Sequence, residues 1–459
     1  MLIRLTVGNY KSFNEETEMP MVSSSKIRMM QGHVIQSDGI KLLKHAAVYG
    51  ANASGKTNLI DCFRFVQHVL NAGLPLKSTN LYCRNDPKNK DRYSLFELQF
   101  SIGGHYYAYG FTAILSQRKI TKEWLYELHR NSTEPLIERI VEDRSILTAL
   151  PLSGKSQARF ETYKEDFLTN DAGLFLSELN RAKRFDEGSP LIIFKRVFDW
   201  LTQQVMVIGP TEPVMADRYH DYLFNKNVRK RIEQTLSSFD TGVSGIELDK
   251  LTNDELLDIV PSPLLRRIIE DVQKRFTSAQ EQNLAVTIRG ETSLTVIQFR
   301  SDGEMEAIAV RLRHKGSRTP FDFSEESDGT RRLFDLIVLL LAVGDDMVFI
   351  VDELERSLHP MLVRRLLTLF MELNEEHSAQ LVFSTHEASI MRQDLFRRDE
   401  IWFVDRDLDG NSRLYSLDRF KERFDKDISK AYLEGRYGAV PVFGELKSSN
   451  GGLSHAARS

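Results

Sequence analysis

A glycine-rich segment near the start of the chain combines residue types that could bind phosphate. Residues 50–57 read G-A-N-A-S-G-K-T and match the G-x-x-x-x-G-K-[ST] phosphate loop. Glycines let the backbone turn so that successive N–H groups face one phosphate chain. Lys56 would reach the β- and γ-phosphates, and the hydroxyl of Thr57 would bind Mg²⁺. The residues expected to contact the nucleotide here are Gly50, Asn52, Ser54, Gly55, Lys56, Thr57 and Asn58.

The residues on either side of this loop predict the elements that position it. The apolar stretch at 46–49 is typical of a buried strand, and Leu59, Phe63, Val66 and Leu70 recur at helical spacing. The loop should therefore end at the N-terminus of a helix, where partial positive charge favours an anion.

A second candidate segment lies far downstream, where an apolar strand predicted at 347–351 precedes Asp352 and Glu353. Asp352 would help to hold Mg²⁺, and Glu353 would polarise the water that attacks the γ-phosphate. A strand that ends in an acidic turn is also common in proteins with no such chemistry. The pair therefore needs support from other segments.

Three further segments provide this support. His386 follows a strand predicted at 380–383, where an imidazole could contact the γ-phosphate. Ser327 and Gly329 begin a long apolar helix, another terminus that favours anions. Residues 357–360 read S-L-H-P and precede an amphipathic helix. Each segment has an ordinary explanation as a strand end or a helix cap, but the order of all of them along the chain is far more specific.

The order and spacing of these segments resemble the head of ABC-type ATPases, in the branch shared by chromosome-maintenance, RecF-like repair and OLD-type ATPases. Tyr10 and Phe13, in G-N-Y-K-S-F, match the N-terminal strand and turn of that branch. The resemblance covers residues 1–130 and 286–440. It implies that two heads enclose two ATP molecules, each with Mg²⁺.

The resemblance also implies a role for each downstream segment. Ser327 and Gly329 would be the signature that contacts the γ-phosphate on the partner, Glu353 the catalytic base and His386 the switch histidine, with 357–359 as the crossing loop. This signature lacks the usual second glycine and glutamine. The glutamine of the glutamine loop stays open among three candidates, which are Gln99, Gln203 and Gln204.

The expected fold is α/β, an ABC-type P-loop ATPase head with a mixed sheet, an antiparallel N-terminal lobe and an inserted helical subdomain. Strands predicted at 93–102 and 106–115 should form a hairpin at Gly103 and Gly104. The expected domains are 1–139, the N-terminal part of the head with the phosphate loop; 140–285, a mainly helical insertion; 286–445, the C-terminal part with the signature, Walker B and switch histidine; and 446–459, a flexible tail.

The amino-acid composition limits the partners and the cellular location that we expect for the protein. The 459 residues carry a net charge of −4, so no overall basic field indicates nucleic acid as a partner. Only Cys62 and Cys83 are present, which fits a reducing cytosol. The N-terminal residues alternate as in a strand and do not resemble a signal peptide, and no apolar run approaches the roughly 20 residues of a membrane helix. We expect a cytoplasmic protein with no membrane partner.

Three other classes of ATPase agree less well with the sequence. In the family of transporter ATPases, the motifs lie closer together along the chain than they do here, and the signature is fully glycine-rich. An OLD-type nuclease would need clustered carboxylates for two metals, and Asp405, Asp407 and Asp409 are the candidates. However, the pair Glu434 and Gly435 comes in the wrong order for a Toprim site, and the remaining chain is too short for a further catalytic domain.

The third class is a RecF-like DNA-repair clamp. Long coiled-coil arms are not expected, because heptads are missing. A basic run could contact a DNA backbone or form a solvated face, and it consists of Arg311, Arg313, His314, Lys315 and Arg318. DNA binding stays open.

The segments 403–417 and 431–446 are similar to stand-alone ATPases of bacterial anti-phage systems such as PARIS. This resemblance implies an ATP-gated sensor and scaffold that forms an ATP-sandwiched homodimer or higher oligomer. It would hold a separate effector, a Toprim-type nuclease, and release it on a phage trigger protein. The alternative is the RecF-like repair clamp. The residues themselves indicate only an ATP-gated dimer and do not distinguish ATP from GTP.

Overall fold

The fold is that of a computed structural model of the chain. It describes residues 1–37, 39–181, 185–186, 188–210, 222–279, 283–289, 293–300, 304–344, 347–421 and 427–441. The predicted tail at 446–459 lies outside the described residues. Among the described helices, none has the length and apolar character needed to cross a membrane.

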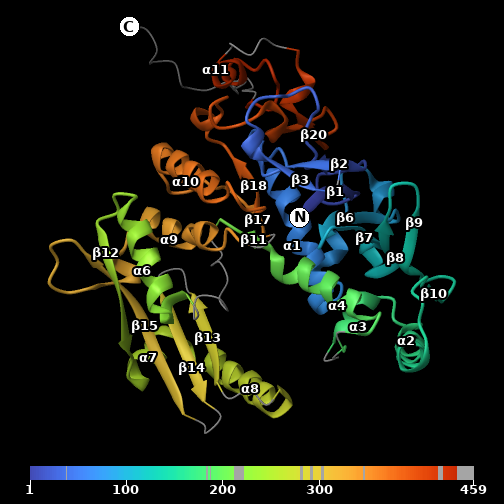
Figure 1. The fold of residues 1–459 in the computed structure, drawn as a ribbon, viewed down its shortest axis with the longest axis horizontal. Coiled ribbons are helices and arrows are strands. Elements are labelled where there is room, and N and C mark those ends of the chain that lie inside the picture. The colour runs from blue at the N-terminus through green and yellow to red at the C-terminus, as the bar shows by residue number, and fades with distance from the viewer. Residues whose placement is uncertain are drawn as a thin grey trace, which may run out of the picture.

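A six-stranded sheet forms the centre of the molecule (Figure 1). Its order is β11 (Val205–Ile208), β17 (Val348–Val351), β18 (Gln380–Thr385), β5 (His45–Tyr49), β19 (Ile401–Arg406) and β20 (Ser412–Ser416). All neighbouring strands are parallel except the last pair, in which β20 is antiparallel to β19. The parallel strands are apolar and buried because elements cover both faces of the sheet.

An antiparallel sheet forms the N-terminal lobe. Its strands in spatial order are β10 (Ser145–Leu147), β9 (Thr133–Ile140), β8 (Lys119–Leu128), β7 (His105–Ile114), β6 (Ser94–Ile102), β1 (Leu2–Gly8) and β2 (Thr17–Pro20). Strands β6 and β7 form the predicted hairpin, and Gly103 and Gly104 both have positive φ at its turn. A small hairpin, β3 (Val34–Ser37) with β4 (Ile40–Leu43), lies beside it.

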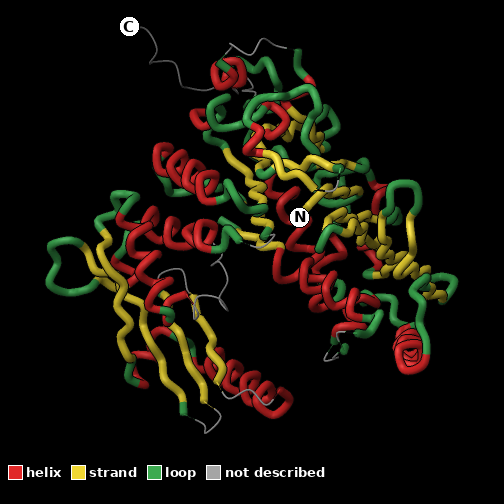
Figure 2. The backbone as a smooth tube through the Cα atoms, in the orientation of Figure 1, coloured by secondary structure: helices red, strands yellow, loops and turns green. Residues whose placement is uncertain are grey.

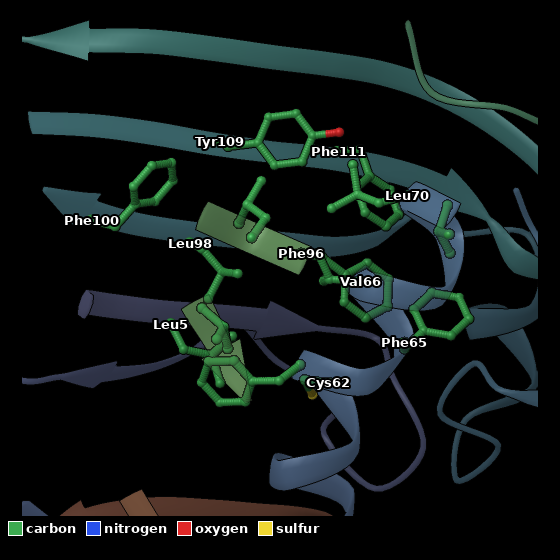
Figure 3. Packing of buried hydrophobic residues seen from close by; sticks show 14 of the residues in the cluster. Leu5, Cys62, Phe65, Val66, Leu70, Phe96, Leu98, Phe100, Tyr109 and Phe111 are labelled. Carbon is green, nitrogen blue, oxygen red and sulfur yellow. The ribbon is translucent and has the colours of Figure 1, made fainter. Parts of the chain in front are cut away.

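Helix α1 (Lys56–Ala72) begins at the end of the phosphate loop and packs against this antiparallel sheet. Figure 3 shows Phe65, Val66 and Leu70 of the helix lying against Phe96 and Phe111 of the sheet. Phe65 and Phe96 have ring centroids 4.9 Å apart. The apolar residues whose spacing predicted this helix thus form the face of α1 that packs on the sheet. This packing fixes the direction of the helix.

A third sheet lies away from the first two, at the lower left of Figure 1. Its order is β12 (Val243–Lys250), β15 (Met305–His314), β14 (Leu294–Arg300) and β13 (Asn283–Arg289), and β16 (Phe321–Asp322) pairs with β15. Figure 2 shows these strands running side by side, with helices packed against the sheet on both of its faces. Those helices are α6 (Lys226–Ser237), α7 (Asn253–Ile259) and α8 (Ser262–Ala279).

The helices expected between 140 and 285 are present, but they form two groups. The first group consists of α2 (Gly154–Phe167), α3 (Phe175–Asn180) and α4 (Ile192–Asp199), beside the N-terminal lobe. Strand β11 then joins the central sheet, and the second group accompanies the third sheet. A four-residue apolar strand such as β11 has no periodicity of its own, so the sequence did not indicate this division. The domain limits at 139 and 285 stay predictions.

Helices α9 (Asp328–Leu341) and α10 (Pro360–Leu373) lie between the central sheet and the third sheet, and α11 (Ile428–Leu433) lies near the C-terminal end (Figure 1). The predicted fold class is confirmed. The chain has the fold of an ABC-type P-loop ATPase head, with a phosphate loop after a central parallel strand and an antiparallel N-terminal lobe.

Candidate nucleotide-binding site

The phosphate loop connects the carboxyl end of β5 to the first turn of α1, as predicted. Two of its glycines have no room for a side chain. A Cβ at Gly50 would collide with the carbonyl of Val404, and one at Gly55 would collide with the hydroxyl of Ser412. Gly55 also has φ of 116°, in the region that favours glycine. The loop is therefore held tightly by β19 and β20.

Lys56 lies over its own loop. Its amine donates to the carbonyl of Gly50 at 2.7 Å and of Ala51 at 3.1 Å, and it lies 3.2 Å from Nδ1 of His386. Burial lowers the pKa of Lys56 to about 8, although the carboxylates of Glu355, Asp352 and Glu353 act in the opposite direction. Phosphate oxygens could replace the carbonyls as acceptors and restore the charged amine.

Four other predicted loop residues differ in their surroundings. Thr57 is exposed in the first turn of α1, so its hydroxyl is accessible to a metal. Ser54 is buried, and its hydroxyl has no hydrogen-bond partner within the part of the chain that the structure describes. Asn58 donates to the hydroxyl of Ser12 at 2.7 Å. The predicted loop residue Asn52 is exposed.

The acidic pair stands at the carboxyl end of β17, two strands from β5. Asp352 is buried and accepts a hydrogen bond from the hydroxyl of Ser384 on β18, which in turn accepts from the backbone N–H of Glu353 at 2.8 Å. Glu353 has φ of 48°, an uncommon value for a residue with a side chain. Strain of this kind persists where surrounding contacts fix it, and it occurs often at functional sites.

His386 follows β18, the strand between those two. Its backbone N–H donates to Oε1 of Glu355 at 2.6 Å. The second oxygen of Glu355 is buried and has no hydrogen-bond partner among the described residues. Glu355 was not predicted as a site residue. The available signal was its place in D-E-L-E, two positions after Glu353.

The predicted signature begins helix α9. Ser327 is exposed and caps the helix, since its hydroxyl accepts from the backbone N–H of Thr330 at 3.1 Å. A Cβ on Gly329 would lie 2.8 Å from the carbonyl of Ser357, so the helix start packs directly on the 357–359 segment. The two segments that the resemblance assigns to a dimer interface are neighbours in one chain.

Arg332 connects this helix to the acidic pair, and it was not predicted. The buried guanidinium donates to the carbonyls of Gly209 at 2.9 Å, Asp352 at 3.1 Å and Glu353 at 3.1 Å. Burial lowers the pKa of Arg332 from its ordinary value. One side chain therefore fixes the helix start against the ends of β11 and β17.

Residues 46–392 match the sequence profile of a family described as an AAA domain, putative AbiEii toxin, Type IV TA system. This chain belongs to that family. No curated protein matches it in sequence.

Two solved structures are similar to the chain at low identity. One is described as the Smc head bound to the C-winged helix domain of ScpA, with 15% identity, coverage of 90% of this chain and 97% of that chain, and a TM-score of 0.38. The other is the SMC head domain from Thermotoga maritima, with 14% identity, coverage of 90% and 98%, and a TM-score of 0.37. The assignment of the chain as a P-loop ATPase rests on the family match, the phosphate loop and the order of the central strands.

The three glutamines considered for the glutamine loop lie on two different elements. Gln203 and Gln204 lie in the π-helical turn Trp200–Gln204 that precedes β11. Because β11 is parallel to β17, that turn is at the opposite edge of the sheet from Asp352. Gln99 lies in the antiparallel sheet and donates to Glu97. This placement disfavours Gln203 and Gln204. The sequence did not show that a strand follows them, and the position of this glutamine stays open. Residues 211–221, after β11, lie outside the described residues.

A polar cavity of about 540 Å³ lies beside the first turn of α1. Its lining includes Lys11, Ser12, Asn58, Arg84 and Arg406. Ser12 belongs to the G-N-Y-K-S-F turn, so this segment of the predicted N-terminal strand and turn borders the site. The cations of this lining would attract an anion, and its amides can donate and accept hydrogen bonds.

Two of the aspartates considered for a nuclease centre, Asp405 and Asp407, have carboxylates that serve the local fold. Asp405 accepts from the backbone N–H of Ala439 at 3.0 Å. Asp407 accepts from the backbone N–H of Asp409 at 3.0 Å and of Asn411 at 2.8 Å, inside the turn between β19 and β20. These bonds stabilise the C-terminal part of the head.

The basic run considered for DNA is largely paired with carboxylates. Arg311 donates to Asp249 and Asp322, and His314 lies 2.7 Å from Glu326. Arg313 pairs with Glu247. These pairs reduce the positive field that a phosphate backbone would meet.

Proposed function

We propose that the chain binds Mg·ATP at this site and hydrolyses it as an ABC-type ATPase. The observation that carries the proposal is the contact of Lys56 with His386. The loop that ends at Lys56 follows β5, His386 follows the adjacent strand β18, and the acidic pair follows β17, the next strand. Lys56 and the loop N–H groups would hold the β- and γ-phosphates, and His386 would contact the γ-phosphate. Glu353 would orient and deprotonate the attacking water.

Thr57 and Asp352 would hold the magnesium ion. Their oxygens are the ligand type that Mg²⁺ prefers, and both residues lie at the carboxyl edge of the central sheet. The ion would neutralise phosphate charge and orient the triphosphate. Ser384 would keep the Asp352 carboxylate turned toward the site.

Two copies of the chain would share the nucleotides. Ser327 is exposed at a helix N-terminus, and Ser357 and His359 are exposed beside it. A second copy could therefore present Ser327 and Gly329 to the γ-phosphate of the first copy. Closure would be favoured only while both γ-phosphates are present, which makes the dimer a two-state element controlled by hydrolysis.

The biological role that we propose is a sensor and scaffold of anti-phage defence in the cytoplasm, similar to AriA of the PARIS system. The chain would hold a separate toxic effector, a Toprim-type nuclease, and release it on a phage cue. Support comes from the family description, which names a Type IV toxin-antitoxin system. A separate effector is also supported by Asp405 and Asp407. Their carboxylates bond to the local backbone, so they do not form a nuclease centre within this chain. The runner-up, a RecF-like repair clamp, is less favoured because the basic run is paired.

The test is a pull-down of the tagged Glu353→Gln variant from lysate of its native host, with ATP present. The matched control is the Lys56→Ala variant, which should not close around ATP. Stoichiometric recovery of a nuclease-like chain with the first variant and not with the second would support the scaffold. Recovery of recombination proteins or DNA without such a chain would favour the repair clamp and overturn the defence role.

A further inference from the structure

A second cluster of side chains lies at the other end of the central sheet. His45 is the first residue of β5, Glu400 immediately precedes β19, and these strands are parallel neighbours. His33 ends the short 3₁₀ helix Gln31–His33. The phosphate loop follows the opposite end of β5, so this cluster is separate from the nucleotide site.

The three side chains converge on one point. Nδ1 of His33 lies 3.0 Å from both oxygens of Glu400, and Nδ1 of His45 lies 3.7 Å from Oε1 of Glu400. One ligand atom from each residue lies within 4.8 Å of the others. The distance of 3.7 Å is too long for a hydrogen bond. Ligands about 2.1 Å from a tetrahedral ion are roughly 3.4 Å apart, so both separations are near those of a metal site.

His45 is the residue that ordinary hydrogen bonding does not explain. It is 1% exposed, and neither ring nitrogen has a hydrogen-bond partner among the described residues. A buried polar group without a partner is costly. A hydrogen bond between His33 and Glu400 would account for those two residues and would leave His45 unsatisfied.

We infer that His33, His45 and Glu400 form a Zn²⁺ site. Two imidazoles and one carboxylate are a common set of zinc ligands, and a water molecule would complete the tetrahedron.

The ion would fix three segments that are distant in the sequence. Glu400 is already oriented by the backbone N–H of Arg397, which donates to Oε2 at 2.8 Å. The neighbouring Asp399 accepts from the backbone N–H of Ser24, and Arg397 donates to the carbonyl of Met29. The metal would thus join the 24–33 segment to the starts of β5 and β19. Its role is structural, and it does not depend on the proposed ATPase chemistry.

The experiment measures zinc in the full chain after its affinity tag has been removed. The protein is stripped with a chelator, titrated with Zn²⁺ without nucleotide, passed through gel filtration and analysed by plasma mass spectrometry. We expect about one zinc ion per chain. Titration with Co²⁺ should produce the visible absorption of a tetrahedral site with nitrogen and oxygen ligands.

Glu400→Gln keeps the size of the side chain and should lower the bound zinc to near zero. Glu123→Gln is the matched control, because Glu123 is also a fully buried carboxylate that accepts from backbone N–H groups, those of Phe175 and Leu176. It should retain wild-type zinc. If Glu400→Gln does not fold, His33→Gln takes its place at the more exposed edge of the cluster. Folded wild-type protein that binds no Zn²⁺ at micromolar concentration, or an undiminished zinc content in the Glu400 variant, would overturn the site.

Discussion

The amine of Lys56 lies 3.2 Å from Nδ1 of His386, so the phosphate loop and the end of β18 meet at the carboxyl edge of the central sheet. The two residues are brought together because β5 and β18 are adjacent parallel strands. Lys56 also bonds to two carbonyls of its own loop. A γ-phosphate entering this space would contact the amine and the imidazole together.

The first prediction concerns Lys56→Ala. Removing a charge-assisted contact to phosphate should weaken ATP binding by at least about tenfold and abolish turnover. Equilibrium binding of a fluorescent ATP analogue measures the first effect, and phosphate release measures the second. Lys77→Ala is the control, since Lys77 is exposed on a different element. Normal ATPase activity in the Lys56 variant would contradict the assignment of the phosphate loop.

The second prediction separates binding from chemistry. Glu353→Gln should bind ATP normally but lower kcat by about two decades or more, because a general base is lost. The longer life of the ATP-bound state should appear as a dimer in light scattering with ATP. Turnover at the wild-type rate would show that another group activates the water.

Glu355 supports a third prediction, in which two substitutions are compared. Its carboxylate accepts from the backbone N–H of His386, and a glutamine oxygen could accept the same bond. Glu355→Ala should therefore lower kcat by about tenfold through displacement of His386, whereas Glu355→Gln should stay close to wild type. Equal loss in both variants would mean that the charge of Glu355 matters, and no loss in either would remove its positioning role.

Much of the fold could be predicted because the main signals are local. The strand at 46–49, the helix from Lys56 and the strand at 347–351 all follow from short apolar patterns beside motif residues. The order of the motifs then implied that these strands share one sheet, which the structure confirms. The carboxyl ends of parallel strands meet at one edge, so the site residues of the separate motifs come together.

Other features depend on partners that the sequence does not reveal. Arg332 is one of two adjacent arginines in an otherwise mainly apolar helix, and only the fold shows that three carbonyls accept hydrogen bonds from it. The basic residues Arg311 and Arg313 were a candidate DNA contact until β12 supplied Asp249 and Glu247 as their partners. Long-range strand pairing carries no local pattern, and it decides whether a charge faces solvent or a counter-ion.

The fourth prediction uses the pKa of Lys56. Burial lowers this pKa to about 8 in the free protein, and the negative phosphates of ATP would raise it in the complex. Binding should therefore take up a proton above pH 8, and ATP affinity should fall by up to about tenfold per pH unit as pH rises through that value. Below about pH 7 the free amine is already charged, and this dependence should vanish.

The measurement is calorimetry of wild-type protein with a non-hydrolysable ATP analogue, in pairs of buffers that differ in ionisation enthalpy. A difference in observed enthalpy between the buffers counts the protons taken up. Affinity that stays constant through pH 8, with no proton uptake, would contradict the lowered pKa.

The last prediction tests the contact between the signature helix and the 357–359 segment. In Gly329→Ala the new Cβ would lie 2.8 Å from the carbonyl of Ser357, so one of the two backbones must move. We expect a loss of about 1–3 kcal/mol of stability, as in other overpacked sites, and a lower kcat. Nucleotide affinity of the isolated chain should change little, because Gly329 would contact only the nucleotide of a partner.

Gly344→Ala is the control, since a Cβ there meets no atom within 4 Å. Calorimetric melting and ATPase assays of both variants decide the point, and full activity in Gly329→Ala would show that this close approach is not needed for turnover.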